Sequence, residues 1–227
     1  MNLQQLRCAT REVLRDFAEP VYWSDEQINR YLNNAVREAC IRARLLKDDH
    51  LSNPDLCRYT VAPGNPVIKL KPEVLVARSG HLGCQREKLW MVTAESMDRI
   101  YPQWEADTAC PGQAGYGIMD LAQKTIRLFP RPMAPDVLHL RVWRYPLASE
   151  LMCRDTDSPV IVLPDAEELK HWAAYECYLA RDGEENLDTR GATHLATFEQ
   201  RFGSRPSLHE MARWADSPPR HRRSVFW

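Results

Sequence analysis

The sequence lacks long apolar runs, closely spaced cysteine pairs and any large excess of one charge. No apolar stretch approaches the roughly 20 residues that a membrane-spanning helix needs, and no signal-peptide pattern opens the chain, so we expect a soluble protein. The 30 lysines and arginines nearly balance the 31 aspartates and glutamates, for a net charge of −1. A chain so close to neutral is not typical of proteins that neutralise many phosphates on DNA.

Cysteine spacing and missing motifs exclude further classes of protein. The seven cysteines are odd in number and no two have CxxC spacing, so we expect free thiols rather than disulfides or a zinc–thiolate centre. The sequence contains no HExxH, GxSxG, P-loop or dinucleotide-binding glycine motif. Two close pairs, His171 with Glu168 and His81 with Cys84, lack the further partners that catalysis or metal binding requires. We therefore predict no catalytic residue, no cofactor and no metal site.

Apolar residues at helical spacing predict a pair of helices at each end of the chain. The first pair covers roughly residues 3–17 and 24–47, and Ser24 with Gln27 matches a capping box at the start of its second helix. The second pair lies between Pro164, which suits a helix start, and Gly203, which suits a helix end. We expect the two pairs to pack as one helical bundle. Its predicted core residues are Ile28, Tyr31, Leu32, Leu169, Trp172, Leu195, Phe198 and Phe202.

Short segments with strand patterns replace the helical pattern in the middle of the chain. The predicted strands cover residues 58–61, 67–70, 74–78, 88–93, 116–120, 124–129 and 137–145, and residues 94–101 indicate a short helix. We expect these strands to form an antiparallel β module inserted between the helix pairs. The predicted fold class is α+β. Its parts are the first helix pair (1–55), the β module (56–150), the second helix pair (151–203) and an extended tail (204–227).

Two groups of basic residues are candidates for nucleic-acid binding. One lies on the second predicted helix (Arg37, Arg42, Arg44 and Lys47), and the other lies in the β module (Arg127, Arg131, Arg141 and Arg144). Acidic residues near both groups balance their charge. Direct DNA binding is therefore the weaker interpretation.

The C-terminal tail has weak periodicity and a composition that suits docking onto another protein. Arginine and tryptophan are enriched at the anchoring positions of protein interfaces. The alternative is a frayed chain end, as is common at termini. The candidate docking residues are Arg205, Arg213, Arg220, Arg222, Arg223, Phe226 and Trp227.

Four segments, taken with the order of the predicted elements, resemble phage head–tail adaptor proteins. The segments are residues 22–46, the triplet Pro102-Gln103-Trp104, residues 163–182 and residues 198–206. The resemblance extends over about residues 3–206. It includes adaptors of the tail tubular protein A type from podophages, which are connector components beneath the portal.

The resemblance implies a structural virion protein without an active site. Such adaptors form a homo-oligomeric ring, typically twelvefold, at the portal vertex, where the ring extends the DNA channel and provides the platform for the tail. The implied partners are the portal protein, the tail tube or nozzle protein, further copies of the chain, and genomic DNA that passes without sequence-specific binding. No membrane contact is implied, and assembly takes place in the host cytoplasm. By similarity, the tail after Gly203 runs along the portal.

Three other functions remain open at this stage. The chain could be a different virion connector, such as a stopper or tail-completion protein. It could instead be a nucleic-acid-binding regulator, whose affinity for DNA would depend strongly on salt. An enzyme with a site dispersed over the fold is the third alternative, and the absence of any catalytic motif counts against it.

Overall fold

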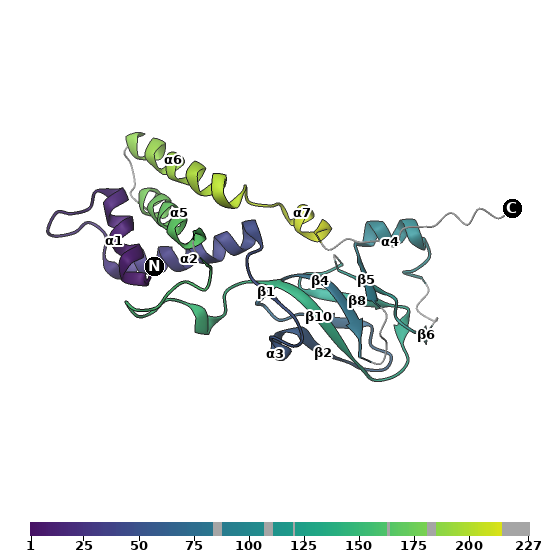
Figure 1. Cartoon of the computed structure of the whole chain (residues 1–227). Helices are drawn as coiled ribbons and strands as arrows, with labels where there is room; N and C mark the ends of the chain where they lie inside the picture. The colour runs from purple at the N-terminus through teal and green to yellow at the C-terminus, as the bar shows by residue number, and fades with distance from the viewer. Residues whose placement is uncertain (84–87, 107–110, 120, 163, 181–184, 215–227) are drawn as a thin grey trace. The chain divides into compact units, whose positions relative to one another are not determined.

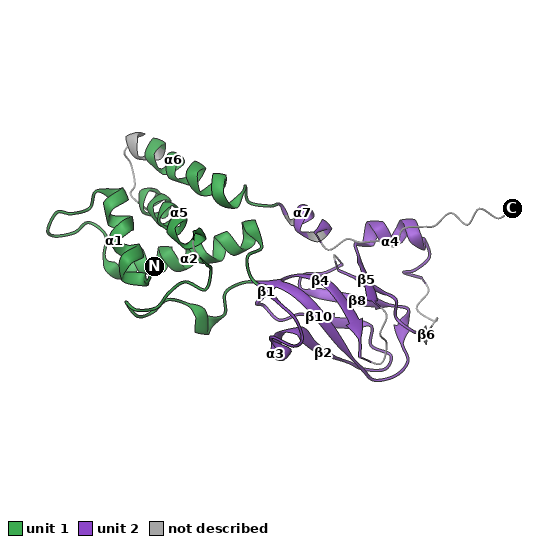
Figure 2. Ribbon diagram, in the orientation of Figure 1, with its two compact units in different colours: residues 1–46, 145–206 green, residues 47–144, 207–227 purple. Residues whose placement is uncertain are grey.

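The computed structural model shows an α+β protein, as predicted, whose contacts divide it into two compact units (Figures 1 and 2). It describes residues 1–83, 88–106, 111–119, 121–162, 164–180 and 185–214. Unit 1 consists of Met1–Leu46 and Tyr145–Pro206, and unit 2 consists of Lys47–Arg144 and Ser207–Trp227. The sequence-based division after residues 55, 150 and 203 stays a prediction, whereas the contact-based units divide after residues 46, 144 and 206.

Unit 1 is helical. Its helices are α1 (Leu3–Leu14), α2 (Asp25–Ala43), α5 (Asp165–Leu179) and α6 (Glu185–Phe202), with a short 3₁₀ helix at Ala148–Glu150. None of the described helices of the chain is both long and apolar enough to cross a bilayer.

The local signals at the start of α2 predict its structure well. The Ser24 hydroxyl accepts a hydrogen bond from the backbone N–H of Gln27, and the Gln27 side chain accepts one from the Ser24 N–H, as a capping box requires. The preceding helix is shorter than the sequence indicated. It ends at Leu14 because Arg15 adopts a left-handed conformation with φ of 57° and closes the last turn.

Helix α5 is central to unit 1 and packs against α1, α2 and α6. The core between these helices includes Leu3 and Leu6 from α1 and Phe198 from α6, all of them fully buried. Buried alanines allow α2 and α5 to approach closely. They include Ala35 and Ala39 on α2 and Ala173 on α5.

Unit 2 contains a twisted sheet and three short helices among its described residues. The helices are α3 (Pro54–Cys57), α4 (Ala94–Ile100) and α7 (Leu208–Arg213). The strands are β1 (Lys47–Asp48), β2 (Arg58–Val61), β3 (Val67–Lys69), β4 (Val74–Leu82), β5 (Lys88–Val92), β6 (Pro111–Gly112), β7 (Tyr116–Ile118), β8 (Thr125–Phe129), β9 (Arg131–Pro132) and β10 (Asp136–Arg144).

The sheet is mixed, so the prediction of a purely antiparallel module was wrong. Its strand order is β1-β10-β4-β5-β7-β8-β3, with β2 also paired to β10, and β6 pairs separately with β9. Strands β5 and β7 run parallel. Parallel neighbours need a crossover connection, and the short helix α4 lies in the segment that joins β5 to β7.

Strand β10 separates the two faces of the sheet by simple alternation. Leu138, Leu140 and Val142 are buried in the core of unit 2. His139 and Arg141 point to the opposite face, because successive side chains of a strand alternate. This outward face therefore carries polar side chains.

We predict that Phe198→Ala lowers the free energy of unfolding by about 3–5 kcal/mol, the usual cost of truncating a large buried aromatic side chain. Phe198 is fully buried on α6, whereas Gln200 on the same helix is exposed. The matched variant Gln200→Ala should change stability by less than about 0.5 kcal/mol. Urea denaturation of both variants measures the difference, and equal effects would contradict the packing described for α6.

Candidate interaction surfaces

The predicted bundle-core residues lie on three helices of unit 1. Most of them are buried: Ile28, Tyr31 and Leu32 on α2, Leu169 on α5, and Phe198 and Phe202 on α6. Trp172 and Leu195 are half-buried. The ring of Phe198 lies 4.5 Å from that of Phe202 and 5.1 Å from that of Trp172. These residues pack the unit internally, so its partner surfaces must come from other side chains.

Arg42 is buried beside α6, although the sequence placed it on a basic helix face open to nucleic acid. Its guanidinium donates to Glu38 Oε1 at 2.9 Å, to Glu199 Oε1 at 2.8 Å and to the carbonyl oxygen of Gly203 at 3.0 Å. It also lies over two aromatic rings of the core, at 5.1 and 5.5 Å. The predicted basic face is therefore wrong at this position, because Arg42 has its charge paired inside the unit.

Arg42 and Glu38 contact the first residues of the C-terminal segment, where the segment leaves unit 1. Gly203 follows α6 with φ of +85°, a conformation that favours glycine. Arg205 lies just beyond it, is exposed, and forms an ion pair with Glu38 at 3.4 Å. Glu38 thus contacts both the buried arginine of α2 and the first of the predicted docking residues.

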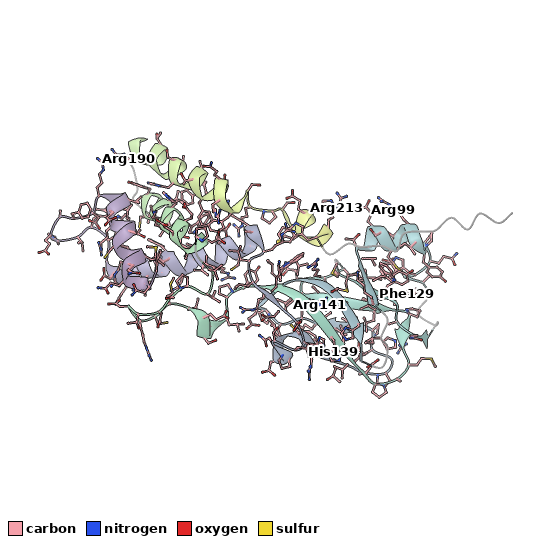
Figure 3. The ribbon with its side chains drawn as sticks, viewed as in Figure 1. Arg99, Phe129, His139, Arg141, Arg190 and Arg213 are labelled. Atoms are coloured by element: carbon pink, nitrogen blue, oxygen red, sulfur yellow. The ribbon has the colours of Figure 1, made fainter. Side chains whose placement is uncertain are left out.

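The structure describes only part of the predicted docking set. Arg213 is exposed at the end of α7 in unit 2 (Figure 3). The next residue, Trp214, places its ring 6.2 Å from that of Trp143 on β10 in an edge-to-face arrangement. Arg220, Arg222, Arg223, Phe226 and Trp227 lie outside the described residues.

The α1–α2 loop, residues 15–24, presents apolar side chains to solvent. The exposed fractions are 68% for Phe17, 58% for Tyr22 and 43% for Val21. Asp16 shapes the loop, since its carboxylate accepts hydrogen bonds from the backbone N–H groups of Tyr22 at 2.9 Å and Trp23 at 3.2 Å. Sequence reasoning did not identify this loop as a surface. Several apolar side chains exposed together on one loop are typical of a protein contact site.

Three of the four arginines in the predicted basic group of the β module contact other residues of unit 2. Arg144 is buried and paired with Asp48 at 2.6 Å. Arg127 lies over the ring of Trp104 at 5.0 Å, and Arg131 donates a hydrogen bond to a backbone carbonyl. These contacts reduce the charge that the group offers to phosphates.

The outward face of β10 carries His139 and Arg141 (Figure 3). An open pocket of about 180 Å³ lies along this face, and its lining includes Lys47, Asp49 and Arg141. The lining also includes Arg78 and Asp48, so acidic side chains offset much of its positive charge.

A histidine pair joins α5 to α6. Nδ1 of His171 lies 3.1 Å from Nδ1 of His194, and the predicted neighbour Glu168 is 3.7 Å from His171 Nε2. The His194 ring also stacks on Tyr178 at 5.8 Å. Burial lowers the pKa of both imidazoles, and the proximity of His171 lowers the pKa of His194 further. The pair is therefore suited to a neutral, hydrogen-bonded contact between the helices.

A family model for the SU10 adaptor protein matches residues 1–223, which is nearly the whole chain. The chain therefore belongs to the SU10 adaptor protein family, and its predicted relation to phage head–tail adaptors is confirmed. The family is one of phage structural adaptors, which are virion components that interact with other virion proteins. A comparison with curated proteins found no match.

We predict that the His171–His194 pair makes unit 1 less stable as the pH falls below neutrality. A free histidine has a pKa of about 6.5, and both pKa values are lower in the folded chain. Protons therefore bind the unfolded chain more strongly, so the contribution of the pair is complete above about pH 6.5 and is lost as the pH falls.

Urea denaturation between pH 7.5 and 5 tests this prediction on the wild type and on the double variant His171→Gln, His194→Gln. The wild type should lose more stability than the variant, since all other titrating groups are common to both proteins. His209→Gln, which changes an exposed residue, is the control and should follow the wild type. A difference between wild type and double variant that is independent of pH would contradict the assignment.

Proposed function

We propose that the chain is the subunit of a homo-oligomeric ring that joins the portal of a phage head to its tail. In this role the ring lies beneath the portal, extends the DNA channel and provides the platform for the tail tube or nozzle. The observation that carries the proposal is the family match over residues 1–223, which includes both units and most of the C-terminal segment. A structural adaptor is defined by its neighbours, so the surfaces described above are its candidate functional parts.

The C-terminal segment is the proposed contact with the portal. Its first residue, Gly203, is fixed to unit 1 by a hydrogen bond from Arg42, which also pairs with Glu38. Arg205 and Arg213 are exposed along it. The remaining arginines and the terminal aromatic pair add the residue types that anchor protein interfaces.

The α1–α2 loop is the proposed lateral contact with the next subunit. A ring requires two different surfaces on each subunit, because each copy contacts one neighbour with one surface and the other neighbour with the second. Phe17 and Tyr22 supply exposed apolar area for one of these surfaces. Asp16 orders the loop before assembly, which reduces the entropy lost when it docks.

The charge of the chain supports a conduit rather than a DNA-binding protein. The net charge of −1 provides no general attraction for phosphates. Several arginines that the sequence offered for nucleic acid are paired within their own unit, notably Arg42 and Arg144. DNA can move through a channel only if its walls do not hold the phosphates strongly.

We predict that deletion of residues 215–227 abolishes attachment to the portal ring and leaves both units folded. The deletion removes five of the proposed docking residues and leaves every described residue in place. Co-sedimentation with purified portal rings measures attachment, and circular dichroism with thermal melting checks the fold.

A matched variant separates the role of charge from that of chain length. Replacing Arg220, Arg222 and Arg223 with glutamine keeps the segment intact and should weaken attachment in a salt-dependent manner. If the truncated protein attached to the portal as the wild type does, the proposed docking role of the segment would be wrong. Salt-sensitive binding of the free protein to DNA would instead favour a nucleic-acid-binding regulator.

We also predict that Phe17→Glu prevents ring formation without unfolding the subunit. Phe17 is largely exposed, so the change should alter stability by less than about 0.5 kcal/mol. A charge at an apolar interface must be desolvated, which disfavours the contact. Sedimentation velocity in the presence of portal rings shows whether the ring forms. The control is Glu19→Gln, an exposed change in the same loop, and a ring that tolerates Phe17→Glu would exclude the loop as lateral contact.

A further inference from the structure

Three histidines that are far apart in the sequence meet on the outward side of the sheet in unit 2. His81 on β4 and His139 on β10 are directly opposite each other in the strand register, and Figure 3 marks the position of His139. His50 lies in the turn after β1, which also pairs with β10. One nitrogen from each ring can be chosen such that all three atoms lie within 4.8 Å of one another. The fold thus brings three imidazole rings close together.

The ring geometry leaves the three imidazoles within reach of one metal ion. The rings of His81 and His139 stack with an interplanar angle of 18°, and His50 meets both edge-on, with centroids 5.2 and 4.6 Å away. Imidazole nitrogens around tetrahedral zinc lie about 3.3 Å apart, because each Zn–N bond is about 2.0 Å long. Movements of the ligand nitrogens by about 1 Å, within reach of small side-chain rotations, complete the coordination.

An unsatisfied ring nitrogen in the cluster also favours a metal ligand. Nδ1 of His139 is buried and has no hydrogen-bond partner in the described part of the chain. Such an atom is costly without a partner, and coordination of a metal ion through Nδ1 would supply one.

The donor atoms indicate which class of ion the cluster would bind. Three imidazoles without a carboxylate in the first coordination sphere prefer zinc, copper or nickel over magnesium or calcium.

We propose that His50, His81 and His139 form a binding site for a divalent transition-metal ion, with zinc as the natural occupant and water as its fourth ligand. The bound ion would connect the turn after β1 to β4 and β10, and so stabilise unit 2. The sequence predicted no metal site here, because the close pair His81 and Cys84 lacks further ligands nearby in the chain. The strand register supplies the missing ligand from β10.

Calorimetric titration of the full chain with zinc chloride, after removal of metal by a chelator, tests the proposal. We expect one ion per chain, a Kd of about 1 μM or lower, and a rise in melting temperature of several degrees at saturation. His81→Ala and His139→Ala should each weaken binding at least tenfold. Without metal, both variants should keep the circular dichroism spectrum of the chelator-treated wild type, which separates lost binding from lost folding.

Two control variants identify the site. His209→Ala, which changes an exposed residue of α7, should bind as the wild type does. The double variant His171→Ala, His194→Ala removes the other close histidine pair and should also bind normally. Cobalt absorption supplies a second readout, because tetrahedral coordination gives intense visible bands that should vanish with His139→Ala. Absence of stoichiometric zinc binding, or loss of binding only when His171 and His194 are replaced, would overturn the proposal.

Discussion

The buried guanidinium of Arg42 is the interaction on which the far end of unit 1 depends. It donates hydrogen bonds to the carboxylates of Glu38 and Glu199 and to the carbonyl oxygen of Gly203, which follows α6. It also lies over the rings of Trp172 and Phe198. Replacement of Arg42 would leave the buried Glu38 carboxylate with only the longer contact to Arg205, and an unpaired buried charge is strongly destabilising. Arg42 therefore connects α2 to α6 and to the start of the C-terminal segment. In a protein that acts through its neighbours, this coupling links the core to the proposed portal contact.

Unit 2 is organised by a different constraint, the alternation of side chains along β10. Leu138, Leu140 and Val142 are committed to the core, which leaves His139 and Arg141 on the outward face. Strand register then brings His81 beside His139, and the pairing of β1 with β10 brings the following turn close enough to add His50. The same sheet that buries the apolar residues thus assembles a cluster of imidazoles.

Local signals in the sequence predicted the fold well, and long-range pairings marked the limit of prediction. The capping box at Ser24 and the short helix α4 follow from neighbouring residues, so periodicity and caps were sufficient to find them. The parallel pairing of β5 with β7 could not be predicted, because it depends on a crossover rather than on either strand alone. Arg42 was misplaced for a similar reason: its partner Glu199 is remote in the chain. The Glu38–Arg42 spacing was the one local sign of its burial.

The central claim is that the subunit assembles as a ring on the portal. Measuring the mass of the purified chain, alone and mixed with portal rings from the same phage, tests this claim most directly. The account predicts a subunit that is small when alone and adds to the portal in a fixed, saturating number of copies, giving one discrete complex. A chain whose mass does not change with portal rings, and which instead shifts in the presence of DNA, would contradict it.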